Sequence, residues 1–288
     1  MTPDAASILI RAAGWITLFQ ADGCALFLLL FGGVLVRTTA TVRKLGSLTA
    51  AAAAVLVIGH QLLEPARMAD EFAGIWDAHL QALAWTPDEA AAPLLQSFAM
   101  GMLASSMGAL PAGRSARALA LVALAVSLLA FTVSGHTSVA AASRLLTPLL
   151  AVHVAIVAFW VGSLLPLWFV SRSETAAAQH AVFTRFSRLA LRLVPALALV
   201  GIAIASILLP DWSALRRPYA LLLGVKLGLF ALLMVCAALN RRFWAPGATA
   251  GTGGAPRTLR RSLLTEAALA ATVLAVTATL TTLYSPVD

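Results

Sequence analysis

Charged side chains are scarce in this sequence. Asp, Glu, Lys and Arg make up 11% of its 288 residues, whereas a soluble domain carries about 25%. Hydrophobic residues make up 60% of the chain, and a water-soluble protein of this length could not bury so much apolar surface. The composition therefore excludes a soluble globular domain and indicates an integral membrane protein whose main partner is the lipid bilayer.

Cysteine is scarce as well, since Cys24 and Cys236 are the only two in the chain. Both lie far from the outer ends of the apolar segments described below, so we do not expect a disulfide framework. The Gly-x-Ser-x-Gly and His-Glu-x-x-His motifs of soluble hydrolases are absent from the sequence. We therefore do not expect an enzyme.

The chain contains eight apolar runs separated by clusters of charge. Each run is long enough for a helix to cross a hydrocarbon layer about 30 Å thick, which takes about 20 residues. A membrane β-barrel would show short alternating runs instead. The sequence therefore predicts an all-α bundle, one membrane domain over residues 1–288, with spans at Ile8–Val36, Leu45–Leu63, Ala91–Leu110, Ala118–Gly135, Leu145–Phe169, Leu189–Leu209, Tyr219–Leu239 and Leu263–Tyr284.

Basic residues predict the orientation of the bundle. The odd-numbered connections hold 14 of the 20 Lys and Arg residues, namely Arg37, Arg43, Lys44, Arg114, Arg117, Arg172, Arg185, Arg188, Arg192, Arg241, Arg242, Arg257, Arg260 and Arg261. The positive-inside rule then places both termini outside. The net charge of +8 follows from this asymmetry, and it gives no reason to expect a nucleic-acid partner. Most acidic residues fall at the outer side, where they would concentrate cations.

Two connections are long enough for their own structure to be predicted. In 64–90, apolar residues recur at helical spacing opposite polar ones, which predicts a short amphipathic helix on the outer surface. In 240–261, Pro and Gly are frequent, which predicts a flexible cytoplasmic linker.

Histidine and methionine gather toward the predicted outer half of the membrane. The candidate ligands there are His60, His79, His136, His153, Met100 and Met102. Imidazole and thioether together suit copper, and sulfur favours Cu(I). Cys24 and Cys236 could add an inner relay of soft ligands, although buried cysteine usually behaves as a small hydrophobic residue. The alternative to metal binding is a structural role, in which the methionines pack between helices and the histidines cap helix ends. His180 is expected to be solvated in the basic connection.

Two ionisable groups fall within predicted spans. Asp22 lies about 21 Å below the start of the first span, and Lys226 about 11 Å below the start of the seventh. Such groups are costly unless they are paired or hydrated, and they often mark a pathway. An ion pair between them would have to bridge about 10 Å of depth. A pathway role and a structural role both remain open for these two residues.

From Ser134 onward the chain contains an ordered series of short motifs: Ser134-Gly135-His136, His153 followed by Phe159–Leu167, Phe186–Ala190, Lys226–Leu229, Asn240-Arg241 and Glu266. This series resembles the copper resistance protein D (CopD) family. The resemblance covers about Leu145–Asp288 and is weaker over the first 110 residues. One departure is Arg216-Arg217-Pro218-Tyr219, where a Tyr-Gly pair is commoner in the family.

The resemblance implies a bacterial inner-membrane protein that handles copper, often regarded as moving it from periplasm toward cytoplasm. Some relatives carry a fused periplasmic copper-binding domain. This sequence has none, which implies a separate periplasmic chaperone resembling CopC. In the resulting hypothesis, His60, His136 and His153 hold copper with help from His79 and Met100.

Two other functions fit the same residues. Histidines facing each other on neighbouring spans, such as His60 and His136, could bind a b-type haem for electron transfer. No second tier of histidines lies near the inner side, however, to complete an electron path across the membrane. A membrane scaffold or sensor without transport is the third alternative.

Overall fold

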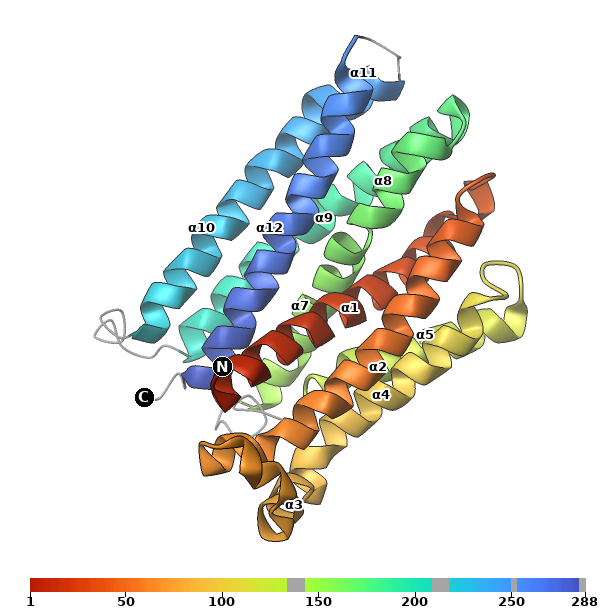
Figure 1. Cartoon of the computed structure of the whole chain (residues 1–288). Helices are drawn as coiled ribbons and strands as arrows, with labels where there is room; N and C mark the ends of the chain where they lie inside the picture. Colours follow the sequence, from red (N-terminus) through yellow and green to blue (C-terminus); the bar gives the residue numbers. More distant parts are fainter. Residues whose placement is uncertain (134–142, 209–217, 250–252, 285–288) are drawn as a thin grey trace.

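The computed structural model describes residues 1–133, 143–208, 218–249 and 253–284. The described ranges contain helices and no strand, which agrees with the all-α class predicted from the sequence. Figure 1 shows the long helices side by side in one bundle. In chain order the elements are α1 (Pro3–Phe31), η1 (Gly32–Val34), α2 (Thr39–Ala69), η2 (Phe72–Trp76), α3 (Ala78–Ala84), α4 (Pro87–Met107), α5 (Arg114–Ala130), α7 (Ser143–Gly162), α8 (Leu164–Ser173), α9 (Ala176–Leu208), α10 (Pro218–Leu239), the π-helical turn η4 (Asn240–Trp244), α11 (Ala245–Thr249) and α12 (Ala255–Leu283).

Six helical stretches in the described ranges are long and apolar enough to cross a membrane. They are Pro3–Val34, Thr39–Ala69, Arg144–Ser173, Ala176–Ile207, Ala220–Ala248 and Ala255–Leu283. The chain is therefore a multi-pass membrane protein. The other two predicted spans coincide with α4, of 21 residues, and α5, of 17 residues, which do not meet the same criteria. The total of eight spans and the orientation remain predictions.

The connections between helices divide between the two ends of the bundle. Figure 1 places the N-terminus, α3 and the C-terminal end of α12 at one end. The turns α1–α2, α4–α5 and α8–α9 lie at the other end, together with α11. The basic residues of the predicted cytoplasmic connections, such as Arg37, Arg114 and Arg172, thus share one end of the molecule. This arrangement is the one that the charge pattern requires.

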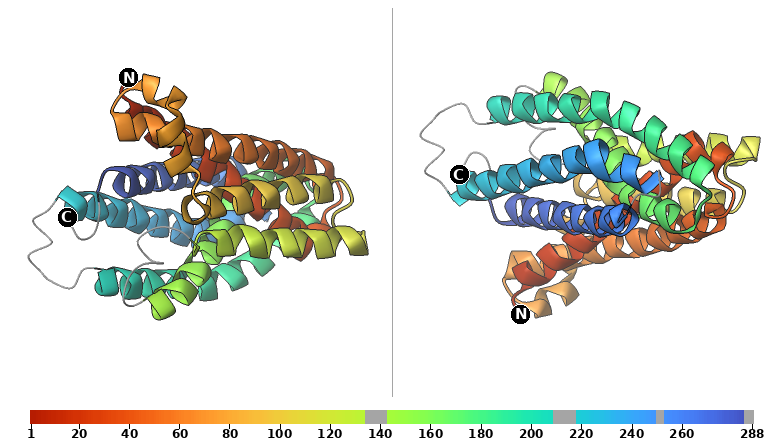
Figure 2. Two further views of the ribbon diagram at one scale, coloured as in Figure 1. Left: turned by 90° about the horizontal axis from the view of Figure 1, so that it is seen from below. Right: turned by 90° about the horizontal axis from the view of Figure 1, so that it is seen from above.

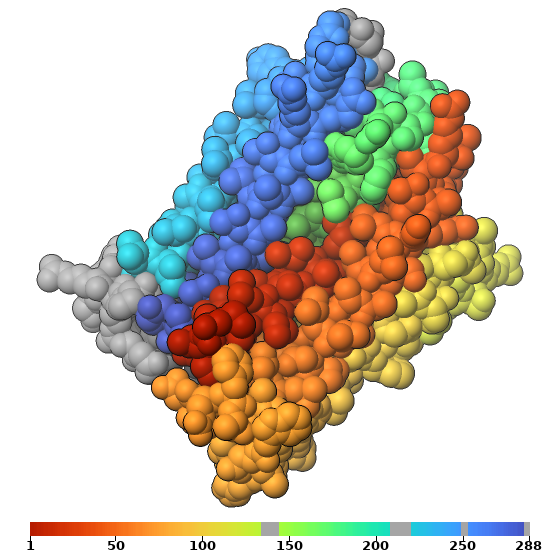
Figure 3. Space-filling view, in the orientation of Figure 1, coloured from red at the N-terminus to blue at the C-terminus, as the bar shows by residue number. Residues whose placement is uncertain are grey.

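The first helix, α1, lies at the centre of the packing. Its start is fixed locally, because the Thr2 side chain accepts a hydrogen bond from the Ala5 N–H at 3.3 Å, and Pro3 occupies the first turn. The space-filling view shows α1 between α2 and α12 (Figure 3). Its large side chains Phe27, Leu28 and Phe31 are almost fully buried. A central apolar helix of this kind organises the bundle.

The predicted fifth span is interrupted between α7 and α8 at Ser163. Pro166 explains the break, because it has no N–H to donate to the carbonyl of Gly162, four residues earlier. The Gln20 side chain of α1 donates to that carbonyl instead, at 2.8 Å. At the same point α1 and α7 cross closely, since a Cβ on Gly23 would lie 2.2 Å from the Gly162 Cα. The hydrogen bond from Gln20 and the close crossing of α1 and α7 therefore connect the first half of the chain to the second half at this break.

Two segments differ from the sequence-based expectations. The connection 64–90 contains the end of α2, then η2 and α3, rather than one amphipathic helix. Phe72, Trp76 and Leu83 are nevertheless exposed on it, as a segment on the membrane surface requires. The connection 240–261 is helical through η4 and α11, and α12 begins as early as Ala255. The frequent Pro and Gly residues therefore do not produce an irregular linker in the described part, because helix ends tolerate both residues.

Candidate metal site

His60 lies toward the C-terminal end of α2, which is predicted to face outward, and its ring nitrogen Nε2 already has hydrogen-bond partners. Arg11 Nε donates to this nitrogen at 3.0 Å, and Ser7 Oγ lies at the same distance. The Glu64 carboxylate, one turn further along α2, is 3.4 Å away. Because Arg11 has no acceptor, Nε2 must accept and the ring proton must sit on Nδ1. A copper ion at Nε2 would have to displace Arg11.

His60 is part of a larger set of polar and charged side chains, which we call the outer network. Its members are Asp4, Ser7, Arg11, His60, Glu64 and Arg67. Arg67 donates to Asp4 at 3.0 Å and to Glu64 at 2.9 Å. Arg11 and Arg67 also donate to the backbone carbonyls of Thr281 and Thr282, at 3.2 and 2.9 Å. The outer network thereby joins the start of α1 to the C-terminal ends of α2 and α12.

His153 lies in a different environment, on α7. Its Nδ1 atom is buried and has no hydrogen-bond partner among the described residues. The ring lies beside Gly201 of α9, where an added Cβ would come within 3.5 Å of His153 Cε1. The Lys226 ammonium of α10 is close enough to act electrostatically on the ring. Helices α7, α9 and α10 therefore meet at an imidazole whose Nδ1 atom has no partner in the described chain, and a metal ligand needs such a nitrogen.

The other predicted outer ligands are dispersed. His136 lies outside the described residues. His79 is exposed at the start of α3, where its backbone N–H donates to the Asp77 carboxylate at 2.8 Å. Met100 is fully buried in the core, whereas Met102 is half-buried. Within the described ranges, no group of three or more His, Cys, Asp and Glu residues is placed to hold a metal ion.

The two intramembrane charges predicted from the sequence do not form an ion pair. Asp22 is fully buried on α1, and Ser127 Oγ of α5 donates to its Oδ2 at 2.9 Å. Its other oxygen, Oδ1, has no partner in the described part of the chain. Lys226 lies instead near His153. Cys24 is also buried on α1, within 3.3 Å of the Gln20 amide nitrogen.

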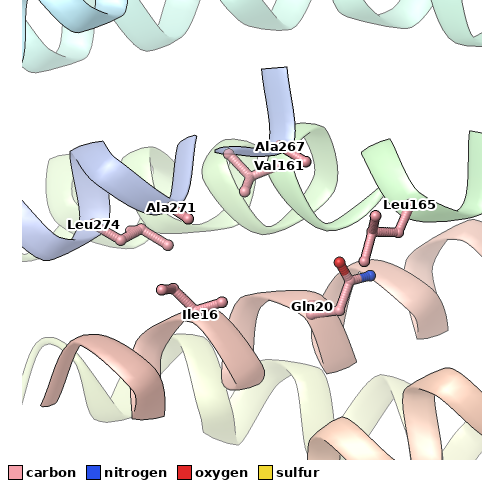
Figure 4. Close-up of a pocket in the computed structure, with 7 residues that line it drawn as sticks. All are labelled: Ile16, Gln20, Val161, Leu165, Ala267, Ala271 and Leu274. Atoms are coloured by element: carbon pink, nitrogen blue, oxygen red, sulfur yellow. The ribbon is translucent and has the colours of Figure 1, made fainter. Parts of the chain in front are cut away.

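A cavity of about 90 Å³ opens between α1, α7, α8 and α12. Figure 4 shows its lining residues Ile16, Gln20, Val161, Leu165, Ala267, Ala271 and Leu274. Gln20 is the one polar side chain among these seven, and its amide is committed to Gly162. The cavity therefore offers no set of metal ligands.

A polar cluster that the sequence analysis did not single out lies between α10 and α12. The Asn240 amide nitrogen donates to the buried Glu266 carboxylate. Cys236 precedes Asn240 by one turn, and Ser262 precedes Glu266 by one turn. The Asn240 Oδ1 and Ser262 Oγ atoms are buried without a partner in the described chain. The available sequence signal was the pairing of polar residues at i, i+4 on two otherwise apolar helices.

Glu174, which connects α8 and α9, was also missed by sequence reasoning. Its Oε1 atom accepts hydrogen bonds from the backbone N–H groups of Val36, Arg37 and Thr38, at 3.0, 2.8 and 2.8 Å, and from Thr38 Oγ1 at 2.8 Å. Burial alone would raise the pKa of this carboxyl, but the hydrogen bonds outweigh burial and hold its pKa below the ordinary value. The carboxylate stabilises the start of α2 from the second half of the chain.

Comparison with known proteins identifies the second half of the bundle. Residues 180–280, which run from α9 into α12, match the model of the family copper resistance protein D. Over this region, about a third of the chain, the protein is similar to the copper resistance protein D family. No curated protein and no solved structure matches it significantly. The family region contains Gly201, Lys226 and the cluster around Glu266, and it packs against His153 of α7. The chain is thus a copper-related membrane protein.

Proposed function

We propose that this chain moves copper across the bacterial inner membrane, from the periplasm toward the cytoplasm. The observation that carries the proposal is the match of residues 180–280 to the copper resistance protein D family, within a bundle of membrane-crossing helices. Copper is the transported substrate in this proposal, and nothing in the chain needs to hold it permanently.

In the proposed path, copper first meets the acidic outer end of the bundle. Glu64, Glu71 and Asp77 lie around α3 and the end of α2, and a negative rim raises the local concentration of cations. His153 then binds the ion through its free nitrogen, together with His136. At least two converging ligands are needed, and each imidazole must be neutral to bind.

The remaining predicted residues take supporting roles in this proposal. Asp22 and Lys226 are polar groups along the inward path, as intramembrane charges often are. Met100, Met102 and His79 could assist the first site only after a rearrangement that brings them to it. His60 does not bind the ion in this proposal, because Arg11 holds its Nε2 atom.

We also propose that a separate periplasmic copper chaperone, similar to CopC, delivers the ion. The outer segment supports this proposal, since η2 and α3 project at the end of the bundle that holds the N-terminus (Figure 1). The exposed carboxylates of Glu71 and Asp77 on that segment could meet a basic face of the chaperone.

The test is copper uptake into proteoliposomes that contain the purified chain. We expect His153→Ala to reduce uptake at least tenfold, and His180→Ala, an exposed control on α9, to leave it unchanged. The His136→Ala,His153→Ala double variant should be no worse than either single, because ligands of one site act as a unit. Wild-type liposomes that take up no copper would contradict transport. A strong Soret band in the purified protein would support the haem alternative instead.

A further inference from the structure

The polar cluster between α10 and α12 consists of four side chains: Cys236 near the end of α10 and Asn240 at the start of η4, with Ser262 and Glu266 from α12. Helices α10 and α12 lie side by side over their length (Figure 1). Cys236 and Asn240 share one face where α10 continues into η4, because they are four residues apart, and the same spacing relates Ser262 to Glu266. The hydrogen bond from Asn240 to Glu266 holds the two pairs against each other.

Glu266 is a carboxylate without a balancing charge. It is 2% exposed, and no lysine or arginine in the described ranges makes an ion pair with it. Its one hydrogen-bond partner there is the neutral amide of Asn240. A buried carboxylate is costly unless it is protonated or meets a positive charge. The missing partner is therefore a proton or a metal cation.

The neighbouring atoms are acceptors that also lack partners. Asn240 and Ser262 are 8% and 7% exposed, and their Oδ1 and Oγ atoms are buried without a hydrogen bond in the described part of the chain. Since the amide nitrogen of Asn240 contacts Glu266, its Oδ1 atom lies beside the same carboxylate. Cys236 is half-buried and close enough for the Glu266 charge to act on its thiol.

We propose that Cys236, Asn240 and Glu266 form a second copper site, at the inner end of the bundle and distinct from the site at His153. The Cys236 sulfur selects Cu(I), because thiolate is a soft ligand. Glu266 neutralises the charge of the ion, and Asn240 Oδ1 completes the oxygen contacts. The π-helical turn η4, which begins at Asn240, is a type of local distortion often found at functional sites.

This inference rests on the proposed copper transport but uses different residues, so the two can fail separately. The experiment is an anaerobic titration of the purified full-length chain with Cu(I), supplied from a competing colorimetric chelator. The wild type should bind two copper ions. Cys236→Ser and Glu266→Gln should each lose one of them, or weaken it by at least about tenfold, and should keep the copper that depends on His153. Glu89→Gln, an exposed acid in the first turn of α4, is the matched control and should keep both.

Copper K-edge X-ray absorption measures the sulfur ligands of the bound copper, which would not change if Cys236 had only a structural role. Cys236→Ser should lose one sulfur scatterer, whereas Glu89→Gln should keep it. A wild type that binds one copper, lost only in His153→Ala, would overturn the inner site and leave the proposed transport intact. A wild type that binds no copper would overturn both. If Glu266→Gln does not fold, unchanged binding and sulfur ligation in Cys236→Ser would still be sufficient to reject the site.

Discussion

The two halves of the bundle differ in how fully they are packed. In its most apolar window, α1 has 61% of its residues buried within the protein, whereas α9 and α10 each have 6%. Both views in Figure 2 place α9 on the opposite side of the molecule from α2. The family match, over residues 180–280, includes these two helices and most of α12, which is 33% buried. Helices with few buried contacts are less constrained, which agrees with the proposed passage of an ion between them.

The polar groups differ between the same two regions. In the outer network, Arg11 and Arg67 each contact a carboxylate and a backbone carbonyl. Around α7, α10 and α12, His153 Nδ1 and Asn240 Oδ1 have no partner in the described part. Paired charges hold helix ends together, whereas unpaired acceptors are available to a ligand. Asp22 Oδ1 on α1 lacks a partner as well, so the contrast lies in the ion pairs, which in the described part of the chain are found within the outer network.

The largest expected effect comes from the crossing that joins the two regions. Gly23→Ala would place a Cβ 2.2 Å from the backbone of Gly162, so α1 and α7 would have to separate. We expect a loss of about 3 kcal/mol in stability, at the upper end for overpacking. Thermal unfolding in detergent measures it. The control is Gly224→Ala on α10, where nothing lies within 4 Å, and where alanine should be neutral or add up to about 1 kcal/mol. Equal melting temperatures for the two variants would refute the close crossing.

A smaller loss of stability is expected at Glu174, whose carboxylate caps α2 with four hydrogen bonds. Glu174→Gln removes the charge from these bonds and should cost about 2 kcal/mol. Chemical unfolding at neutral pH measures the loss. Glu71→Gln is the control, since its side chain is exposed and a change there should cost less than about 0.5 kcal/mol.

The same carboxylate predicts a pH dependence. Because the native pKa of Glu174 lies below its ordinary value of 4.5, its contribution is fully present above that value and is lost as pH falls through the native pKa. The stability difference between wild type and Glu174→Gln should stay constant above about pH 5 and shrink below pH 4.5. A difference that grows on acidification would contradict the assignment.

The helices were predictable from the sequence because apolar runs of about 20 residues admit few other structures. The interruption at Pro166 and the helical turn at Asn240 were not predicted, since the same residues also occur in plain kinks and loops. From the sequence alone, His60 and His153 were equivalent candidate ligands, because each is a histidine toward the outer side of an apolar span. Their difference arises from Arg11 and Gly201, which are 49 and 48 positions away and become neighbours only in the folded bundle.

His60→Ala sharpens the contrast between the two histidines. Removing the ring deprives Arg11 and Ser7 of a shared acceptor, so we expect a loss of about 1 kcal/mol in stability and unchanged copper binding. His153→Ala should show the reverse. Thermal unfolding and bound copper are measured on the same samples. Copper lost from His60→Ala at wild-type stability would make His60 a ligand and would place the copper site in the outer network.

The smallest change in stability is expected for Asp22→Asn. The variant keeps the shape of the side chain and its contact with Ser127, so the melting temperature should shift by less than about 2 °C. A pathway role nevertheless predicts that copper uptake falls at least tenfold at normal protein abundance. Poor abundance would indicate a structural charge instead, and full uptake would remove Asp22 from the path.

The most direct test of the account is the copper content of the purified chain, measured together with its visible spectrum, in the wild type, His60→Ala and His153→Ala. We predict that the wild type and His60→Ala bind equal copper, that His153→Ala binds at least one equivalent less, and that none shows a Soret band. Equal copper in His153→Ala and the wild type, at normal folding, would contradict the assignment of copper binding to the helices around the family region.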